Sequence, residues 1–183
     1  NEKIYLFDPS GSGKEAKVIF DRNYQDVYSD PGNFVKNRNE FGSNVIQIQK
    51  GNAFLMGRGF TKDGQFPFIE KLDLLTEKKT RIYTSSYKEK KETISDYDPK
   101  KNEIITRLES PTLYPNYYRQ NLKSGKLNQL TFFENPFKSI QNVHKEVIKY
   151  KRDDGIDLSG TLYLPVGYDK ASKEKMPMII WAY

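Results

Sequence analysis

Any chemistry in this chain must come from its serines, its single histidine and its carboxylates, because it contains no cysteine. Acyl transfer by a serine needs an imidazole beside the hydroxyl, and one widespread form of the nucleophile lies in a G-x-S-x-G elbow. The chain has no such elbow, since Ser12 lies directly between Gly11 and Gly13. The one histidine, His144, has no nucleophile context in the sequence. The sequence therefore predicts no catalytic triad in this chain, and we interpret His144 as a linker residue.

Other short motifs are incomplete. Ser10–Glu15 is similar to a phosphate loop, but Asp8 stands where that motif has its first glycine, and a glutamate replaces its Ser/Thr. Gly57–Gly59 lacks the third glycine of a dinucleotide fingerprint, because Lys62 occupies its position. Asp153–Asp157 is too short for a calcium loop and is typical of a hairpin turn. The sequence therefore indicates no cofactor and no metal site.

Composition favours β-structure with a solvated surface. Only 36% of the 183 residues are apolar, against about 45–50% in typical globular domains, while Tyr and Phe are abundant. No apolar run approaches the ~18 residues of a membrane span. The net charge is +6, but positive and negative residues are mixed, as in Lys88–Glu92. We therefore expect neither a membrane span nor a nucleic-acid surface.

The middle of the chain repeats a four-strand pattern. We predict strands at Asn44–Gln49, Ala53–Arg58, Phe66–Leu74 and Lys78–Thr84, and again at Glu92–Tyr97, Asn102–Glu109, Asn116–Leu122 and Lys126–Thr131. The two sets superpose at a shift of 48 residues, which places Pro67 on Pro115 and Leu74 on Leu122. A four-strand repeat of this length is typical of a β-propeller blade.

A third copy is incomplete. Ile4–Phe20 resembles the second half of a blade, with Ser12–Lys14 at its turn. Two and a half blades cannot close a ring, since propellers have about 4–8 blades. The pattern alone also leaves open an unrelated antiparallel sandwich, because strand patterns define topology loosely.

The last third of the chain reads as a hairpin followed by a buried strand. Apolar and charged residues alternate over Val147–Arg152, a turn follows at Asp153–Gly155, and Ile156–Leu164 has the period of two of a half-buried strand. Met178–Trp181 is a continuous apolar run, which suits a strand covered on both faces.

These stretches resemble the prolyl oligopeptidase family of serine peptidases, and in particular its glutamyl-endopeptidase-like branch. The resemblance rests on D-V-Y-S-D-P-G at Asp26–Gly32, on L-x-G-x-L-Y-L-P-x-G-Y-D at Leu158–Asp169, and on P-x-I-I-W-A-Y at Pro177–Tyr183. In that family a β-propeller precedes an α/β-hydrolase domain. The resemblance thus implies an all-β chain at 1–140, with a half blade and two blades at 44–84 and 92–132. It also implies a linker and the first α/β-hydrolase strands at 141–183.

For function, the resemblance implies a piece of a serine peptidase in which the propeller restricts peptide access to a Ser-His-Asp site after Tyr183. In relatives a tyrosine at the position of Tyr183 donates its hydroxyl to the oxyanion, so Tyr183 is the candidate catalytic residue; the alternative is a packing role. The chain alone is expected to be inactive, and its partner is the rest of the same polypeptide. The other function left open is a non-enzymatic propeller that binds a ligand. The compartment stays undecided, either periplasmic or secreted, or cytoplasmic.

Overall fold

The computed structural model describes residues 1–10, 15–172 and 175–182. Within them the regular structure is made of β-strands and one short 3-10 helix at Lys138–Ile140, without an α-helix. The chain divides into two compact units, Asn1–Glu134 and Asn135–Tyr183. Each unit is described by itself below.

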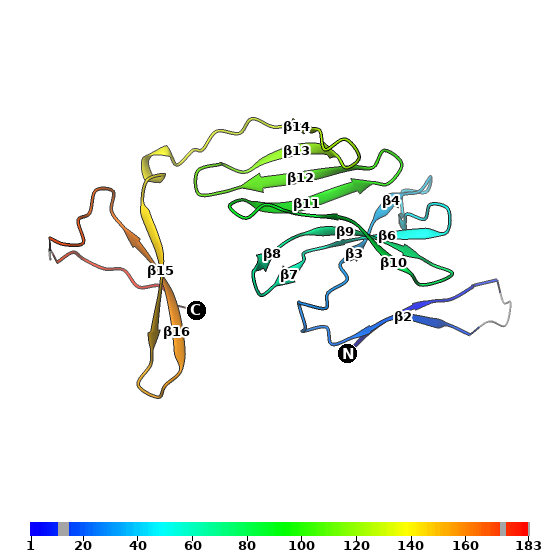
Figure 1. The fold of residues 1–183 in the computed structure, drawn as a ribbon, viewed down its shortest axis with the longest axis horizontal. Helices are drawn as coiled ribbons and strands as arrows, with labels where there is room; N and C mark the ends of the chain where they lie inside the picture. The colour runs from blue at the N-terminus through cyan, green and yellow to red at the C-terminus, as the bar shows by residue number, and fades with distance from the viewer. Residues whose placement is uncertain (11–14, 173–174, 183) are drawn as a thin grey trace. The chain divides into compact units, whose positions relative to one another are not determined.

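The first unit holds two four-stranded antiparallel sheets (Figure 1). The strands of the first sheet, in spatial order, are β10 (Lys79–Thr84), β9 (Phe68–Asp73), β6 (Asn52–Gly57) and β3 (Asn33–Phe34). The second sheet runs in chain order through β11 (Lys91–Asp98), β12 (Glu103–Glu109), β13 (Asn116–Asn121) and β14 (Leu127–Gln129). Neither sheet contains a strand of the other, as the two-set pattern predicted.

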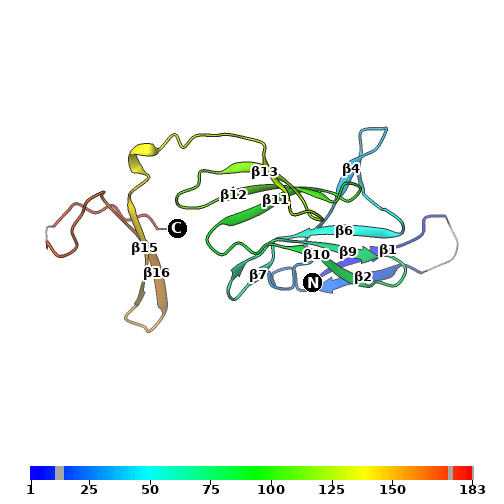
Figure 2. The same ribbon diagram turned by 45° about the horizontal axis from the view of Figure 1, so that its top comes forward.

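Three two-stranded hairpins complete the first unit. They are β1 (Glu2–Leu6) with β2 (Lys17–Arg22), β4 (Lys36–Arg38) with β5 (Asn44–Ile46), and β7 (Phe60–Thr61) with β8 (Gly64–Gln65). Figure 2 shows β4 directed away from the strands of the first sheet. In Figure 1 the hairpin β1–β2, the first sheet and the second sheet follow one another as layers.

The hydrogen bonds of one turn in the first sheet recur in the corresponding turn of the second sheet. The turns after β9 and β13 begin at Asp73 and Asn121, which are 48 residues apart. In both turns the side-chain oxygen of the first residue accepts two backbone N–H groups: Leu75 (3.0 Å) and Thr76 (2.9 Å) at Asp73, Lys123 (3.1 Å) and Ser124 (3.0 Å) at Asn121. Both turns then place a residue in the left-handed region, Glu77 with φ 59° and Gly125 with φ 71°. The predicted 48-residue repeat is therefore present in the last two strands of each sheet and in the turn between them.

One strand prediction for the first sheet is wrong. Residues 44–49 were expected to form its first strand, but that position is taken by β3, which pairs with β6 through Asn33–Met56 and Phe34–Leu55. The segment Asn44–Ile46 is a strand, but it pairs with β4 in a separate hairpin. The apolar residues at 45, 46 and 48 signalled a strand correctly. The two-residue β3, inside a polar stretch, carried too short a pattern to be recognised.

Apolar packing joins the two sheets. The buried cluster between them consists of Phe54 and Ile69 from the first sheet, Val35 directly after β3, and Tyr97 and Ile104 from the second sheet. The Phe54 and Tyr97 rings meet edge to face, with centroids 5.6 Å apart and planes at 63°. Such aromatic pairs contribute roughly 0.5–1.5 kcal/mol beyond the area they bury. The two sheets therefore share one core.

The opposite face of the first sheet is covered as well. Leu55 and Leu72 point away from the second sheet and pack on Phe20 of β2 in a second buried cluster. Successive strand residues point to opposite faces, so a sheet covered on both faces needs consecutive apolar residues. The run Ala53–Leu55 in β6 meets this need, and all three of its residues are buried.

A buried carboxylate lies between the two sheets. Glu92 is 2% exposed, and its two carboxylate oxygens accept hydrogen bonds from the hydroxyls of Tyr83 and Thr106, each at 2.8 Å. Burial, followed by the negative charge of Glu92, raises the pKa of the Tyr83 hydroxyl. Since buried polar groups are costly unless they are paired, this network stabilises one particular arrangement of β10 against β11 and β12.

The second unit contains an antiparallel hairpin of β15 (His144–Lys151) and β16 (Asp157–Leu164). In β16, Leu158, Gly160, Leu162 and Leu164 are partly buried and alternate with exposed residues, which confirms the predicted period of two. His144 is the first residue of β15 and pairs with Leu164, so its interpretation as a linker residue is wrong.

The predicted buried strand at Met178–Trp181 is absent. These four residues have no regular structure and are 72–97% exposed. An apolar run becomes a central strand only when neighbouring strands take its hydrogen bonds and other layers cover its faces. No described residue supplies either. In the described residues the sheets close neither a barrel nor a propeller ring, and no parallel strand pair is present.

The shared core predicts how stability is distributed. Ile69→Ala, at a site with no exposure, should lower the free energy of unfolding by roughly 2–5 kcal/mol, because it leaves a cavity between two layers. The matched control Ile48→Ala removes the same atoms from a side chain that is 57% exposed and should change it by less than about 1 kcal/mol. Urea denaturation measures both. Equal losses would contradict a common core at Ile69.

Candidate functional site

The structure does not describe the residues on which the predicted chemistry was centred. Tyr183, the candidate oxyanion donor, and Ser12–Lys14 of the incomplete phosphate loop lie outside the described residues. Within the described part, no group of three or more His, Asp or Glu side chains is arranged to hold a metal ion. No helix there is long and apolar enough to cross a membrane.

His144 takes part in a charged cluster on the second unit. Its Nε2 lies 3.1 Å from Oε2 of Glu146, and the same oxygen accepts a hydrogen bond from Nζ of Lys170 at 2.6 Å. The Lys170 ammonium, and then His144, hold the pKa of the Glu146 carboxyl below its usual value. No serine hydroxyl hydrogen-bonds to His144 in the part of the chain that the structure describes. The cluster joins β15 to the loop that follows β16, and it lacks the arrangement of a triad.

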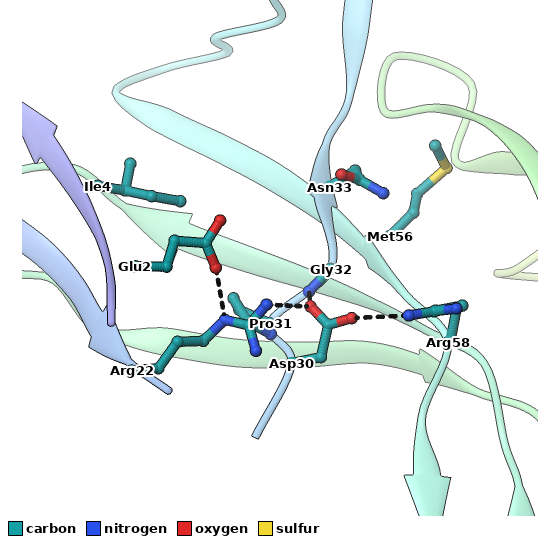
Figure 3. Close-up of a pocket in the computed structure, with 9 residues that line it drawn as sticks. All are labelled: Glu2, Ile4, Arg22, Asp30, Pro31, Gly32, Asn33, Met56 and Arg58. Carbon is teal, nitrogen blue, oxygen red and sulfur yellow. Dashed lines mark hydrogen bonds and ion pairs between the residues drawn. The ribbon is translucent and has the colours of Figure 1, made fainter. Parts of the chain in front are cut away.

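A cavity of about 210 Å³ lies in the first unit, between the β1–β2 hairpin and the first sheet (Figure 3). Its lining is mainly polar and charged. The lining residues are Glu2, Ile4, Arg22, Asp30, Pro31, Gly32, Asn33, Met56 and Arg58. Three of them, Asp30–Gly32, belong to the D-V-Y-S-D-P-G stretch that carries part of the family resemblance. This cavity is the candidate functional site.

Four charged side chains cross the cavity in a line of alternating sign (Figure 3). Nε of Arg22 lies 2.9 Å from Oε2 of Glu2, and Nη2 of Arg22 lies 3.5 Å from Oδ1 of Asp30. On the other side of Asp30, its Oδ2 lies 3.6 Å from Nη2 of Arg58. The order is therefore Glu2, Arg22, Asp30, Arg58, and each inner member of the line has two neighbours of opposite charge.

The Asp26–Gly32 loop is shaped by its own aspartates. Oδ1 of Asp26 accepts the N–H of Tyr28 at 3.0 Å, and Oδ1 of Asp30 accepts the N–H of Gly32 at 3.0 Å. These are Asx turns, in which a short side chain replaces a backbone acceptor. Arg22 adds a hydrogen bond from Nη1 to the backbone oxygen of Asp26, at 3.1 Å. The loop is thus attached to the end of β2.

Gly32 allows the loop to approach the sheet closely. Its φ is +85°, and a Cβ atom at this position would lie 2.2 Å from the backbone oxygen of Met56. A glycine is needed on both counts, because other residues rarely adopt such a φ and no side chain fits against the strand. The close packing of Gly32 on β6 therefore holds Asp30 beside the end of that strand.

No protein-family model matches the chain. The chain is similar in sequence to two curated proteins, each named a probable chloroplastic glutamyl endopeptidase, from Oryza sativa subsp. japonica and from Arabidopsis thaliana. Both are 33% identical to it, over 195 and 196 residues, and each match covers 99% of the chain. The chain spans about a fifth of the length of these relatives, 21% and 20%. The chain is therefore related to a segment of larger peptidases.

Among solved structures, the chain is similar to two forms of the AtxE2 isopeptidase, a variant and an apo form. The TM-scores are 0.38 and 0.35, with 15% and 17% sequence identity. The matches cover 74% and 73% of this chain and 22% of each isopeptidase chain. Similarity this low carries no argument about this chain.

The sequence predicts one wall of the cavity and not the other residues that line it. Asp30 and Gly32 belong to the stretch that resembles the family, whereas Glu2 and Arg22 belong to no motif. Arg58 was noted only within an incomplete dinucleotide motif. The available signal for Arg58 was its place between two glycines at the end of a predicted strand, where close backbone packing is common.

The cavity wall gives a direct test of the close approach at Gly32. Gly32→Ala should lower the free energy of unfolding by roughly 3 kcal/mol, because a strained φ costs about 1–2 kcal/mol and overpacking against Met56 about 1–3 kcal/mol. Gly42→Ala is the control, since Gly42 has φ +77° with open space around its missing Cβ. This substitution should cost only the roughly 1–2 kcal/mol of backbone strain. Urea denaturation of both variants distinguishes strain from crowding. A loss at Gly32 no larger than at Gly42 would contradict the close approach.

Proposed function

We propose that this chain is a segment of a serine endopeptidase that acts on peptides at glutamyl residues. One observation carries the proposal: 33% identity, over 99% of the chain, to two proteins named probable glutamyl endopeptidases. The chain spans about a fifth of those relatives, so the catalytic serine, acid and histidine are assigned to other parts of the whole protein. The serine mechanism comes from the resemblance to the prolyl oligopeptidase family.

Residues 1–140 are proposed to be part of a β-propeller. The four-stranded sheets with a 48-residue repeat support this assignment, as does the burial of both faces of the first sheet. Stacked sheets of this kind bury their faces only against neighbours. The β1–β2 hairpin then corresponds to the outer half of one blade, and the two sheets correspond to the next two blades. In the whole protein such a ring would restrict the access of large substrates to the catalytic site.

Residues 141–183 are proposed to lead into the α/β-hydrolase domain. The β15–β16 hairpin, with one partly buried apolar face, is consistent with the first strands of such a domain. Tyr183 is proposed to donate its hydroxyl to the oxyanion, on the basis of its position in P-x-I-I-W-A-Y. A preorganised donor aimed at the developing negative charge stabilises the transition state more than the ground state.

The first functional prediction concerns the location of the nucleophile. The 183-residue chain should not react with an active-serine phosphonate and should not hydrolyse peptides, because it lacks the G-x-S-x-G elbow. The full-length protein that contains this chain should be labelled at one serine. Mass spectrometry of the labelled proteins identifies the site. Labelling of a serine within residues 1–183 would refute the assignment, and a full-length protein without labelling or turnover would favour a non-enzymatic binding propeller.

The second functional prediction concerns Tyr183. In the full-length protein, Tyr183→Phe should lower kcat by roughly 10²–10³ with little change in KM, because it removes one oxyanion donor and keeps the ring. Tyr168→Phe in the same unit serves as the control and should leave kcat near its original value. Steady-state kinetics on a glutamyl peptide measures both variants. If kcat of Tyr183→Phe stays within about threefold, well under the ~10²-fold expected, Tyr183 has a packing role.

A further inference from the structure

The two inner members of the charge line, Arg22 and Asp30, are mostly buried. Arg22 has a side-chain exposure of 17% and directs its three nitrogens to Glu2, to the backbone oxygen of Asp26 and to Asp30. Asp30 accepts the Gly32 N–H and lies beside two arginines, with 18% of its side chain exposed. Both side chains are mostly buried and lie between neighbours of opposite charge, so they are less accessible to a ligand than Arg58 is. Both therefore act as supports of the cavity wall.

Arg58 forms the cationic end of the line and, unlike Arg22 and Asp30, is largely exposed. Its side chain is 64% exposed, and its one ion-pair contact within the described residues is the 3.6 Å approach to Asp30. That distance is longer than a hydrogen bond to a carboxylate, which is about 2.7–2.9 Å. The guanidinium also lies over the Phe60 ring, 5.2 Å from its centroid. A guanidinium has five N–H donors, and most of those on Arg58 remain open to solvent.

The backbone that carries Arg58 is tightly held. A Cβ at Gly57 would lie 2.1 Å from the Phe68 ring, and a Cβ at Gly59 would lie 1.8 Å from the backbone oxygen of Phe66. Gly59 also accepts a hydrogen bond from the N–H of Phe66 at 2.8 Å. Rigid backbone on both sides, with Asp30 and Phe60 beside the side chain, orients the guanidinium before any ligand arrives. Such preorganisation reduces the entropy lost on binding.

We infer that Arg58 binds the carboxylate of an acidic peptide side chain at the mouth of this cavity; the inference rests on the proposed function, which supplies the glutamyl peptide. The planar guanidinium matches a carboxylate in a bidentate pair. The cavity, at about 210 Å³, is smaller than the ~300–1,000 Å³ of typical ligand pockets, so it suits one side chain of a longer peptide. Glu2 lies at the opposite end of the line, beyond Arg22, and Asp30 lies on the inner side of Arg58, so the incoming carboxylate is placed on the outer, exposed side of the guanidinium (Figure 3).

Peptide binding to the 183-residue chain tests this inference without any catalysis. Two capped peptides that differ only in one Glu or Gln are titrated against the chain and followed by NMR. The Glu peptide should bind more tightly, and Arg58→Gln should reduce the preference by roughly 10- to 100-fold, as expected for a lost charged hydrogen-bond pair. Arg38→Gln, at an exposed arginine of β4, is the matched control and should keep the preference. Equal affinities of the original chain for the two peptides would overturn the inference.

Kinetics of the full-length protein separates this inference from the proposed function. The ratio of kcat/KM for the Glu peptide to that for the Gln peptide should fall roughly 10- to 100-fold in Arg58→Gln and should recover partly in Arg58→Lys, which keeps the charge but not the planar fork. If the protein cleaves peptides and the ratio is unchanged in Arg58→Gln, the acidic side chain binds elsewhere and the inference fails. If the protein cleaves no peptide while the chain still prefers the Glu peptide, the proposed function fails and the binding site stands.

Discussion

The first unit depends on one constraint: a four-stranded sheet has two faces and cannot bury either of them alone. The first sheet satisfies this constraint because it has a neighbouring layer on each face. Phe54 points toward the second sheet and Leu55 toward the β1–β2 hairpin, so adjacent residues of one strand belong to two different cores. Burying a large apolar side chain contributes about 1.5–3 kcal/mol. Each layer is therefore stabilised by apolar packing against its neighbour.

Polar groups add specificity to this layered packing. Apolar contacts between sheets tolerate sliding, whereas the hydrogen bonds from Tyr83 and Thr106 to the buried Glu92 are satisfied in one register only. The repeated turns at Asp73 and Asn121 give corresponding strands the same start, so that the two sheets present matching faces. A propeller assembled from such units would need this regularity, because small errors in blade register accumulate around a ring.

The cavity is a consequence of the same layering. Arg22 ends a strand of the hairpin, Asp30 lies in the loop that enters the first sheet, and Arg58 follows the second strand of that sheet. Three elements from two layers thus meet at one end of the stack. Because the layers are held by their cores, the charged groups at this end can be arranged for binding, and only Arg58 keeps its donors exposed. In the proposed peptidase, a propeller segment outside the Ser-His-Asp triad would in this way contribute to substrate choice.

The sequence alone determined most strands of the two sheets, their turns and the 48-residue repeat of the last two strands, because alternating apolar residues and turn-forming residues act over a few neighbouring positions. Tertiary structure decided which strands pair and which are covered. The apolar runs at Ala53–Met56 and Met178–Trp181 look alike in sequence, yet the first is largely buried in a sheet with neighbours on both faces and the second is exposed without a partner. Likewise, nothing local to Arg58 revealed that Asp30 lies beside it. Burial and ion pairing join residues that are distant along the chain, so they are decided only when the layers meet.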